Sequence, residues 1–209
     1  MELKGKRINF LGDSITDCYH NYDTDNLGEG YVRMIAETLG YGFGKVKVIN
    51  KGVDGLTLSG LDRLWKRDGA SLNPDIITIL IGINDIGMIK NTGLDPVFAL
   101  KEFKMNYQLL ISQIREQYQV PIVLMEPFIF PHPEEYKNWE PELLEMNRII
   151  RSLAKEMDLT FIPLWPDLLD AAKLYSYPEI TVDGIHLTDP GHLIIANKWL
   201  NTCGELIDL

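Results

Sequence analysis

The sequence predicts an α/β protein whose parallel five-stranded sheet is covered by helices on both faces. Short apolar runs rich in β-branched residues alternate with segments of helical periodicity, which is typical of parallel strands joined by helical crossovers. Three of these runs, at 8–11, 76–81 and 122–125, are almost continuously apolar, as expected for strands buried on both faces. Because such crossovers are right-handed, we expect the strand order 2-1-3-4-5.

The individual elements follow from the same patterns. Strands are expected at 7–11, 45–50, 75–81, 121–126 and 160–164, and helices at 31–39, 56–65, 96–118, 141–157 and 190–200. In the longest helical segment Phe103, Tyr107 and Leu110 recur at three- and four-residue steps, so one face of that helix is apolar. No linker or repeat interrupts the alternation, and residues 1–209 are expected to form a single domain.

Composition and charge exclude several classes of protein. The chain has 209 residues, of which 45% are hydrophobic and 24% charged, as in ordinary globular proteins. A net charge of -10 has the wrong sign for binding nucleic acid or an anionic membrane surface. No apolar run approaches the roughly 18 residues of a membrane span. The few apolar residues after the N-terminus are too short for a signal peptide, so a cytoplasmic location is expected, with Cys18 and Cys203 reduced.

Ligands of such a sheet bind beyond the carboxyl ends of its strands, where the strand order reverses. Ser14 lies there, after a tight Gly12-Asp13 turn that follows the first strand. A serine hydroxyl becomes a nucleophile when a neighbouring base removes its proton. Serine also caps helices readily, so this motif alone does not separate the two roles.

A base for Ser14 must come from the histidines. His186 has Asp183 three residues earlier, close enough for the carboxylate to accept from one ring nitrogen while the other faces a serine. His192 stands in the same relation to Asp189, but Asp followed by Pro is typical of a helix N-cap and first helical position. We therefore favour His186.

Hydrolysis of an ester also requires donors for the developing oxyanion. Asn84 follows the third strand and offers a side-chain N–H, and Gly55 offers a backbone N–H that a substrate can approach closely. A helix cap at Asn84 and a simple turn at Gly55 remain alternatives for each residue alone. Their joint position in front of Ser14 favours an oxyanion hole.

Four motifs resemble those of the GDSL (SGNH) hydrolase family. They are Gly-Asp-Ser-Ile-Thr-Asp at 12–17, Asn-Lys-Gly-Val-Asp-Gly at 50–55, Ile-Gly-Ile-Asn-Asp at 81–85 and Asp-Gly-Ile-His at 183–186. The resemblance implies a three-layer α/β/α sandwich with a flavodoxin-like sheet. It also implies that Ser14 is the nucleophile, His186 the base and Asp183 its orienting acid, with an oxyanion hole from Ser14 N–H, Gly55 N–H and the Asn84 side chain. The second and third motifs are similar to those of small acetylesterases, including some that act on acetylated sugars.

The sequence also bears on other functions, namely nucleotide binding, metal binding and non-catalytic ligand binding. The first turn lacks the glycine pattern of nucleotide-binding proteins, and no cofactor is expected. The segment 21–32 begins like a calcium loop but has Asn26 and Val32 at the required Gly and Glu positions, so no metal site is expected there. A metal hydrolase built on Asp13, Asp183 and His186 stays open, as does a non-catalytic binding module on the same fold.

The substrate is predicted only in outline. The loop at 127–140 follows the fourth strand and is rich in aromatic residues that can stack on sugar rings, although local packing explains them equally well. We expect Asp13, Phe128 and Trp139 to contact a small-molecule ester. No apolar lid accompanies the site, so short acyl chains, acetyl groups on carbohydrates foremost, are favoured over a lysophospholipase or thioesterase activity. Assembly into a homo-oligomer is left open.

Overall fold

The computed structural model describes residues 6–40 and 46–207. Within them, all strands are parallel and form one sheet in the predicted order β2-β1-β3-β4-β5. The strands are β1 Lys6–Gly12, β2 Val46–Gly52, β3 Ile76–Leu80, β4 Ile122–Met125 and β5 Thr160–Ile162. The sheet order and the helical layers confirm the predicted α/β fold.

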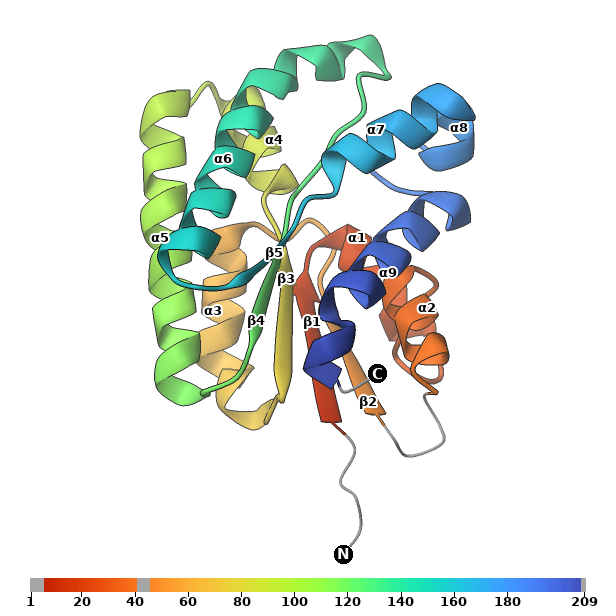
Figure 1. Ribbon diagram of the computed structural model, residues 1–209. Coiled ribbons are helices and arrows are strands. Elements are labelled where there is room, and N and C mark those ends of the chain that lie inside the picture. Colours follow the sequence, from red (N-terminus) through yellow and green to blue (C-terminus); the bar gives the residue numbers. More distant parts are fainter. Residues whose placement is uncertain (1–5, 41–45, 208–209) are drawn as a thin grey trace, which may run out of the picture.

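Helices cover both faces of this sheet (Figure 1), with α3, α4, α5 and α6 on one side and α1, α2 and α9 on the other. The helices are α1 Ser14–Asp17, α2 Tyr31–Thr38, α3 Leu58–Asp68, α4 Ile83–Thr92, α5 Pro96–Gln117, α6 Glu140–Glu156, α7 Trp165–Leu174, α8 Tyr177–Ile180 and α9 Asp189–Cys203. Short 3₁₀ turns occur at His20–Tyr22, Gly69–Ser71, Glu134–Trp139 and Gly204–Ile207. None of the helices in the described ranges is both long enough and apolar enough to cross a membrane.

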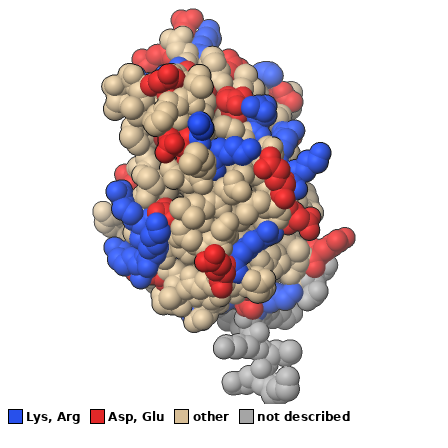
Figure 2. Space-filling view, turned by 90° about the vertical axis from the view of Figure 1, so that its left-hand side faces the viewer, with Lys and Arg blue, Asp and Glu red and all other residues tan. Residues whose placement is uncertain are grey.

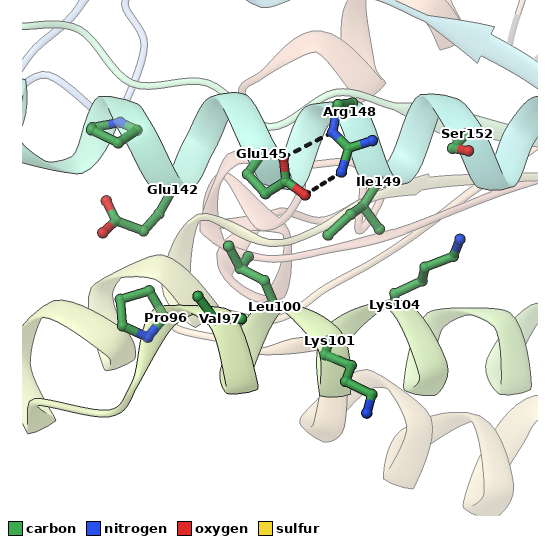
Figure 3. A pocket seen from close by; sticks show the side chains of 11 residues that line it. Pro96, Val97, Leu100, Lys101, Lys104, Glu142, Glu145, Arg148, Ile149 and Ser152 are labelled. Carbon is green, nitrogen blue, oxygen red and sulfur yellow. Dashed lines mark hydrogen bonds and ion pairs between the residues drawn. The ribbon is translucent and has the colours of Figure 1, made fainter.

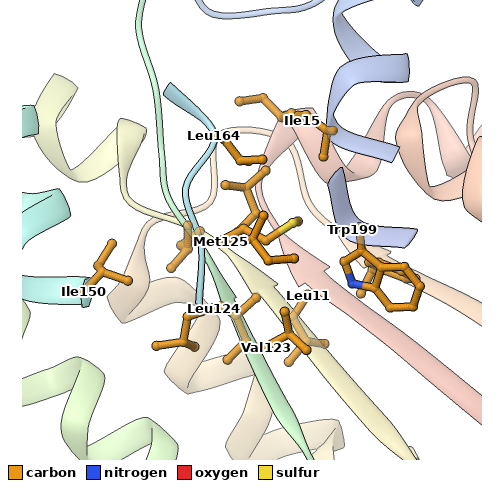
Figure 4. Close-up of a cluster of buried hydrophobic side chains, with 14 of the residues drawn as sticks. Leu11, Ile15, Val123, Leu124, Met125, Ile150, Leu164 and Trp199 are labelled. Atoms are coloured by element: carbon orange, nitrogen blue, oxygen red, sulfur yellow. The ribbon is translucent and has the colours of Figure 1, made fainter. Parts of the chain in front are cut away.

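The core lies on both faces of the strands. Figure 4 shows Val123 and Leu124 of β4 between Ile150 of α6 on one side and Trp199 of α9 on the other. Trp199 is fully buried, and its indole nitrogen donates a hydrogen bond of 2.9 Å to the Thr78 hydroxyl on β3. The hydrogen bond compensates the loss of water around two buried polar groups, so α9 is held at a defined position against the sheet.

The carboxyl ends of β1, β2 and β3 lie unusually close to one another and to α1. Gly12 pairs with both Gly52 of β2 and Leu80 of β3. A Cβ atom at Gly52 would lie 2.1 Å from the backbone nitrogen of Asp17, and one at Gly12 would lie 2.5 Å from the Leu80 carbonyl oxygen. Only glycine permits this approach, which brings the turn after β1 against the ends of both neighbouring strands.

Some element boundaries differ from the prediction. The helix predicted from residue 56 begins at Leu58, because the Thr57 hydroxyl caps it by accepting from Gly60 N at 3.3 Å. Thr188, not Asp189, caps α9, and Asp189 is its first helical residue. The helices α4 and α7 were not predicted, because α4 contains glycine, asparagine and threonine, and the helical run of α7 is short.

Candidate active site

Ser14 is the first residue of α1, a single helical turn that begins where β1 ends. The cap of this turn is Asp13, whose carboxylate accepts from Ile15 N at 3.1 Å. Asp13 is buried, whereas Ser14 is partly exposed. Because the neighbouring aspartate supplies the cap, the serine hydroxyl is available for another partner.

That partner is His186. The Ser14 Oγ and the His186 Nε2 lie 3.0 Å apart, and the His186 Nδ1 lies 2.6 Å from the Asp183 Oδ2. An ionised carboxylate only accepts hydrogen bonds, so the proton of the ring sits on Nδ1 and Nε2 is free to accept from the serine. The three side chains form a continuous hydrogen-bonded chain.

Asp183 is held by its own loop. Its second oxygen, Oδ1, accepts from the backbone nitrogens of Ile185 at 2.9 Å and His186 at 2.8 Å. Partial burial by itself would raise the pKa of Asp183, but the hydrogen bonds from the His186 side chain and from these two nitrogens outweigh it and lower the pKa. The carboxylate therefore stays ionised beside the imidazole.

Thr181 and Gly184 fix the turn that carries this pair. The Thr181 hydroxyl donates to the His186 carbonyl at 2.7 Å and accepts from Gly184 N at 2.8 Å. Gly184 has a positive φ of 96°, and a Cβ atom there would lie 2.2 Å from the His132 carbonyl oxygen. Glycine is thus required both for the turn and for its packing against the loop after β4.

His192 does not take the place of His186. It is buried, its Nδ1 accepts from Tyr31 N at 3.3 Å, and its Nε2 lies 3.6 Å from the Cys18 Sγ. Burial lowers the pKa of His192 to about 4. The sequence favours His186 because Asp189 resembles a helix cap; in the structure, where Thr188 is the cap, the distinction comes from the burial and the partners of His192.

Asn84 lies in the first turn of α4, facing the segment that links β2 to α3. One N–H of its side chain donates to the Leu56 carbonyl at 3.1 Å. Gly55 is exposed, has a φ of 68°, and has no atom within 4 Å of the position of a Cβ. The backbone at Gly55 is therefore open to solvent, and the anchored Asn84 retains a second amide proton.

Two carboxyl groups lie next to these residues, Asp13 buried and Asp85 half-buried. Burial raises the pKa of Asp85 to about 7, against the hydrogen bond that Leu58 N donates to it. Burial also raises the pKa of Asp13 to about 7, and the charge of Asp85 adds to this shift. Two carboxyl groups with raised pKa values thus flank the hydrogen-bonded chain, one at the cap of α1 and one in the first turn of α4.

Ser14 and His186 open into a cleft of about 700 Å³. Its walls include five side chains that were not among the predicted site residues: Tyr19, Tyr22, Val53, Asp54 and Val182. Tyr19 and Tyr22 follow the motif at 12–17 closely in the sequence, and this proximity is the feature from which their place in the cleft could have been predicted. Within residues 6–40 and 46–207, the cleft included, no group of three His, Cys, Asp or Glu side chains is arranged to hold a metal ion.

The comparisons with known proteins agree with this geometry. The profile of the GDSL-like lipase/acylhydrolase family matches residues 10–194. The chain belongs to this family. An acetylxylan esterase from Geobacillus stearothermophilus is 26% identical over 209 residues, which cover 96% of this chain and 94% of the relative.

Two solved structures show the same architecture as this GDSL-like esterase. A protein described as a GDSL-like lipase from Parabacteroides merdae superposes with a TM-score of 0.87 at 29% identity, covering 96% of each chain. The Geobacillus stearothermophilus acetylxylan esterase superposes with a TM-score of 0.83 at 25% identity, covering 98% of this chain and 97% of the other. The protein is a carboxylic-ester hydrolase, which sets aside the non-catalytic alternative.

Two of the three predicted substrate contacts of this GDSL-like esterase, Phe128 and Asp13, need correction. Phe128 has no exposed surface and packs edge to face against Phe130. Trp139 is partly buried and packs against Tyr136 with ring centroids 5.0 Å apart. Asp13 is buried at the cap of α1, with no surface for a substrate. The alternative of local packing therefore holds for Phe128, whereas a contact of Trp139 with the substrate stays a prediction.

A second hollow, of about 530 Å³, lies between α5 and α6 (Figure 3). Val97, Leu100 and Ile149 supply apolar walls, and the carboxylate of Glu145 forms two hydrogen bonds to Arg148 on its rim. All residues that line it come from these two helices. It is thus separate from the strand ends that carry Ser14.

The same side of the molecule has a broad uncharged surface bordered by charged side chains (Figure 2). Large apolar side chains that α5 leaves exposed are Val97, Phe98, Met105 and Leu109. Assembly of the chain into a homo-oligomer stays a prediction.

Proposed function

We propose that this GDSL-like esterase hydrolyses short acyl esters, acetyl esters of carbohydrates foremost, through a covalent acyl-enzyme. The observation that carries the proposal is the chain of hydrogen bonds from Ser14 through His186 to Asp183, with distances of 3.0 and 2.6 Å. It provides a nucleophile, a base that contacts it, and a carboxylate that orients the base.

In the first step the Ser14 Oγ attacks the carbonyl carbon of the ester while its proton moves to the His186 Nε2. The tetrahedral intermediate collapses, the ester C–O bond breaks, and His186 returns the proton to the leaving alcohol. A water molecule then attacks the acyl-enzyme with His186 again as base, which releases the acid and restores Ser14. Asp183 remains ionised throughout and stabilises the imidazolium.

The negative oxygen of each intermediate would be bound by three donors. These are the second amide proton of Asn84, the backbone N–H of Gly55 and the backbone N–H of Ser14. The donation of Asn84 to Leu56 O supports this role, because an oxyanion hole is effective when its donors are already oriented before the charge develops.

The relatives support both the mechanism and the substrate class. Solved forms of the Geobacillus stearothermophilus acetylxylan esterase include catalytic mutants in which an aspartate or a serine is changed to alanine. These are the residue types that we assign to Asp183 and Ser14. The preference of this chain for acetyl groups and for sugars is our inference from that likeness.

The mechanism is tested with 4-nitrophenyl acetate. Ser14→Ala and His186→Ala are each expected to lower kcat by about 10⁴-fold or more. Ser71→Ala, which removes an exposed hydroxyl at the turn after α3, is the matched control and should retain full activity. Unchanged hydrolysis by Ser14→Ala, or loss of the activity on chelation of metal ions, would contradict the proposal.

The substrate class is tested with 4-nitrophenyl esters of increasing acyl length and with acetylated xylo-oligosaccharides. We expect kcat/KM to be highest for the acetyl group and to fall with chain length. A preference for long acyl chains would instead support a lysophospholipase, and a preference for acyl thioesters would support a thioesterase.

A further inference from the structure

We propose that Tyr19 and Tyr22 form a platform on which a neutral sugar ring of the substrate's alcohol part stacks during hydrolysis. This inference rests on the function proposed above, and it assigns a binding role to residues beyond the hydrolytic chain. Both tyrosines line the cleft of Ser14 and His186. The side chain of Tyr19 is 66% exposed and that of Tyr22 is 91% exposed.

The two rings border the cleft into which the leaving alcohol must extend. His186 gives its proton to the leaving alcohol, so this alcohol must lie next to the His186 Nε2. His186 lines the same cleft as the tyrosines. A ring attached to the ester oxygen would therefore extend into the cleft that Tyr19 and Tyr22 border.

The turn that carries the tyrosines is anchored on both sides. Between them, His20 is buried and its Nδ1 is hydrogen-bonded to the Asp17 carboxylate. After them, Asp23 pairs with Arg33 and accepts from Leu27 N at 3.0 Å. A platform on an anchored turn loses little conformational entropy when a ligand binds, and this favours affinity.

Tyr19 has a backbone conformation that is rare for a bulky side chain. Its φ is 64°, and Cys18 before it also has a positive φ of 39°. Such residues cost free energy and persist where the surrounding structure holds them, which is frequent at functional sites. Here the conformation turns a tyrosine toward the cleft that contains the nucleophile.

The charges of the cleft indicate which ligand the rings bind. Asp17, Asp54 and Asp183 line it together with the tyrosines. Carboxylates accept hydrogen bonds from hydroxyl groups and repel anions, so a neutral polyol fits better than a phosphate-bearing lipid. The C–H groups of a sugar ring carry small positive charges that the negative face of an aromatic ring attracts. Aromatic rings beside carboxylates therefore match a carbohydrate.

The proposal is tested by comparing two acetyl esters on the Tyr19→Ala, Tyr22→Ala and double variants. The substrates are acetylated xylobiose, which has sugar rings, and ethyl acetate, which has none. We expect KM for acetylated xylobiose to rise about 10-fold in each single variant and further in the double variant, with kcat/KM for ethyl acetate changed less than about 2-fold. Tyr22→Phe, which keeps the ring, should behave as the parent.

Tyr175→Ala is the matched control, because Tyr175 is 63% exposed at the end of α7 and does not line the cleft. An unchanged KM for acetylated xylobiose in the double variant would overturn the proposal, as would an equal loss on both esters. Calorimetric binding of xylotriose to Ser14→Ala protein, with and without the two tyrosines, gives a readout that needs no hydrolysis. If xylotriose binding is lost when the two tyrosines are removed, the platform is supported even if the proposed reaction is wrong. If binding is the same with and without the tyrosines, the platform is refuted.

Discussion

The half-buried carboxyl group of Asp85 accepts a hydrogen bond from the backbone nitrogen of Leu58 at 3.0 Å. One residue earlier, the Asn84 side chain donates to the carbonyl oxygen of Leu56 at 3.1 Å. The first turn of α4 is thus hydrogen-bonded to residues 56–58, the segment that leads into α3, through one donor and one acceptor. Gly55 directly precedes this segment, so we expect the position of the Gly55 N–H to depend on Asp85 as well as on the turn at Gly55.

We expect Asp85→Ala to lower kcat for 4-nitrophenyl acetate by about 10²-fold with a smaller change in KM, because a displaced oxyanion donor acts on the transition state. Asp85→Asn should restore most of the activity, since an amide oxygen can still accept from Leu58 N. Steady-state kinetics measure this split. If Asp85→Asn is as impaired as Asp85→Ala, the charge of Asp85 matters and a positioning role is refuted.

Asn84→Ala tests the oxyanion hole directly. Removing one donor is expected to lower kcat by about 10²–10³-fold while KM changes little. Asn91→Ala, an exposed asparagine on the same helix, serves as the control for changes in α4. Equal activity of the two variants in steady-state assays would remove Asn84 from the mechanism.

The raised pKa of Asp13 predicts how stability varies with pH. The folded protein releases this proton at about pH 7, whereas the ordinary pKa of the group is 3.8. Between these values the folded state holds a proton that the unfolded state has lost, so the free energy of unfolding falls as the pH rises through this window.

Asp13→Asn keeps a capping oxygen for Ile15 N and abolishes the ionisation. We expect the variant to be more stable than the parent by at least about 1 kcal/mol at pH 8, with the difference shrinking toward pH 4. Urea unfolding at both pH values measures it, with the exposed Asp25→Asn as control. A larger stabilisation at pH 4 than at pH 8 would show that the sign is wrong.

Gly184→Ala is expected to displace the turn of Asp183 and His186. A Cβ atom there would lie 2.2 Å from the His132 carbonyl oxygen, in a backbone conformation with φ of 96°. We expect a loss of roughly 1–3 kcal/mol in the free energy of unfolding and at least about 10-fold in kcat. Gly204→Ala, at a position with φ of -52° and open space around it, should be harmless in the same thermal unfolding and activity measurements.

The sheet and the four motifs were predictable because their signals are local. Apolar runs mark the strands, and the carboxyl ends of parallel strands meet at one edge, which places Ser14, Gly55 and Asn84 in one region before any coordinate is known. The orientation of loop aromatics is a different kind of property. Phe128 lies in the loop after β4 and Tyr22 in the 3₁₀ turn after α1, yet Phe128 is fully buried and Tyr22 is 91% exposed.

Whether a loop side chain points inward depends on the packing of distant segments, which no local pattern encodes. The cap of α9 shows the same limit on a smaller scale. Thr188 and Asp189 are both good capping residues, and the sequence alone does not choose between them. The positive φ of Tyr19 had no sequence signal either, because tyrosine is not a residue that favours this conformation.

Ser14 and His186, the proposed nucleophile and its proposed base, are separated by 172 positions along the chain. During synthesis Ser14 leaves the ribosome early, and it has no base until almost the whole polypeptide has followed. A nascent or truncated chain that ends before His186 is therefore expected to be chemically inert toward the esters around it. If the proposed mechanism holds, hydrolysis begins only after the segments that carry Ser14 and His186 have met, and the appearance of activity then marks the completion of this part of folding.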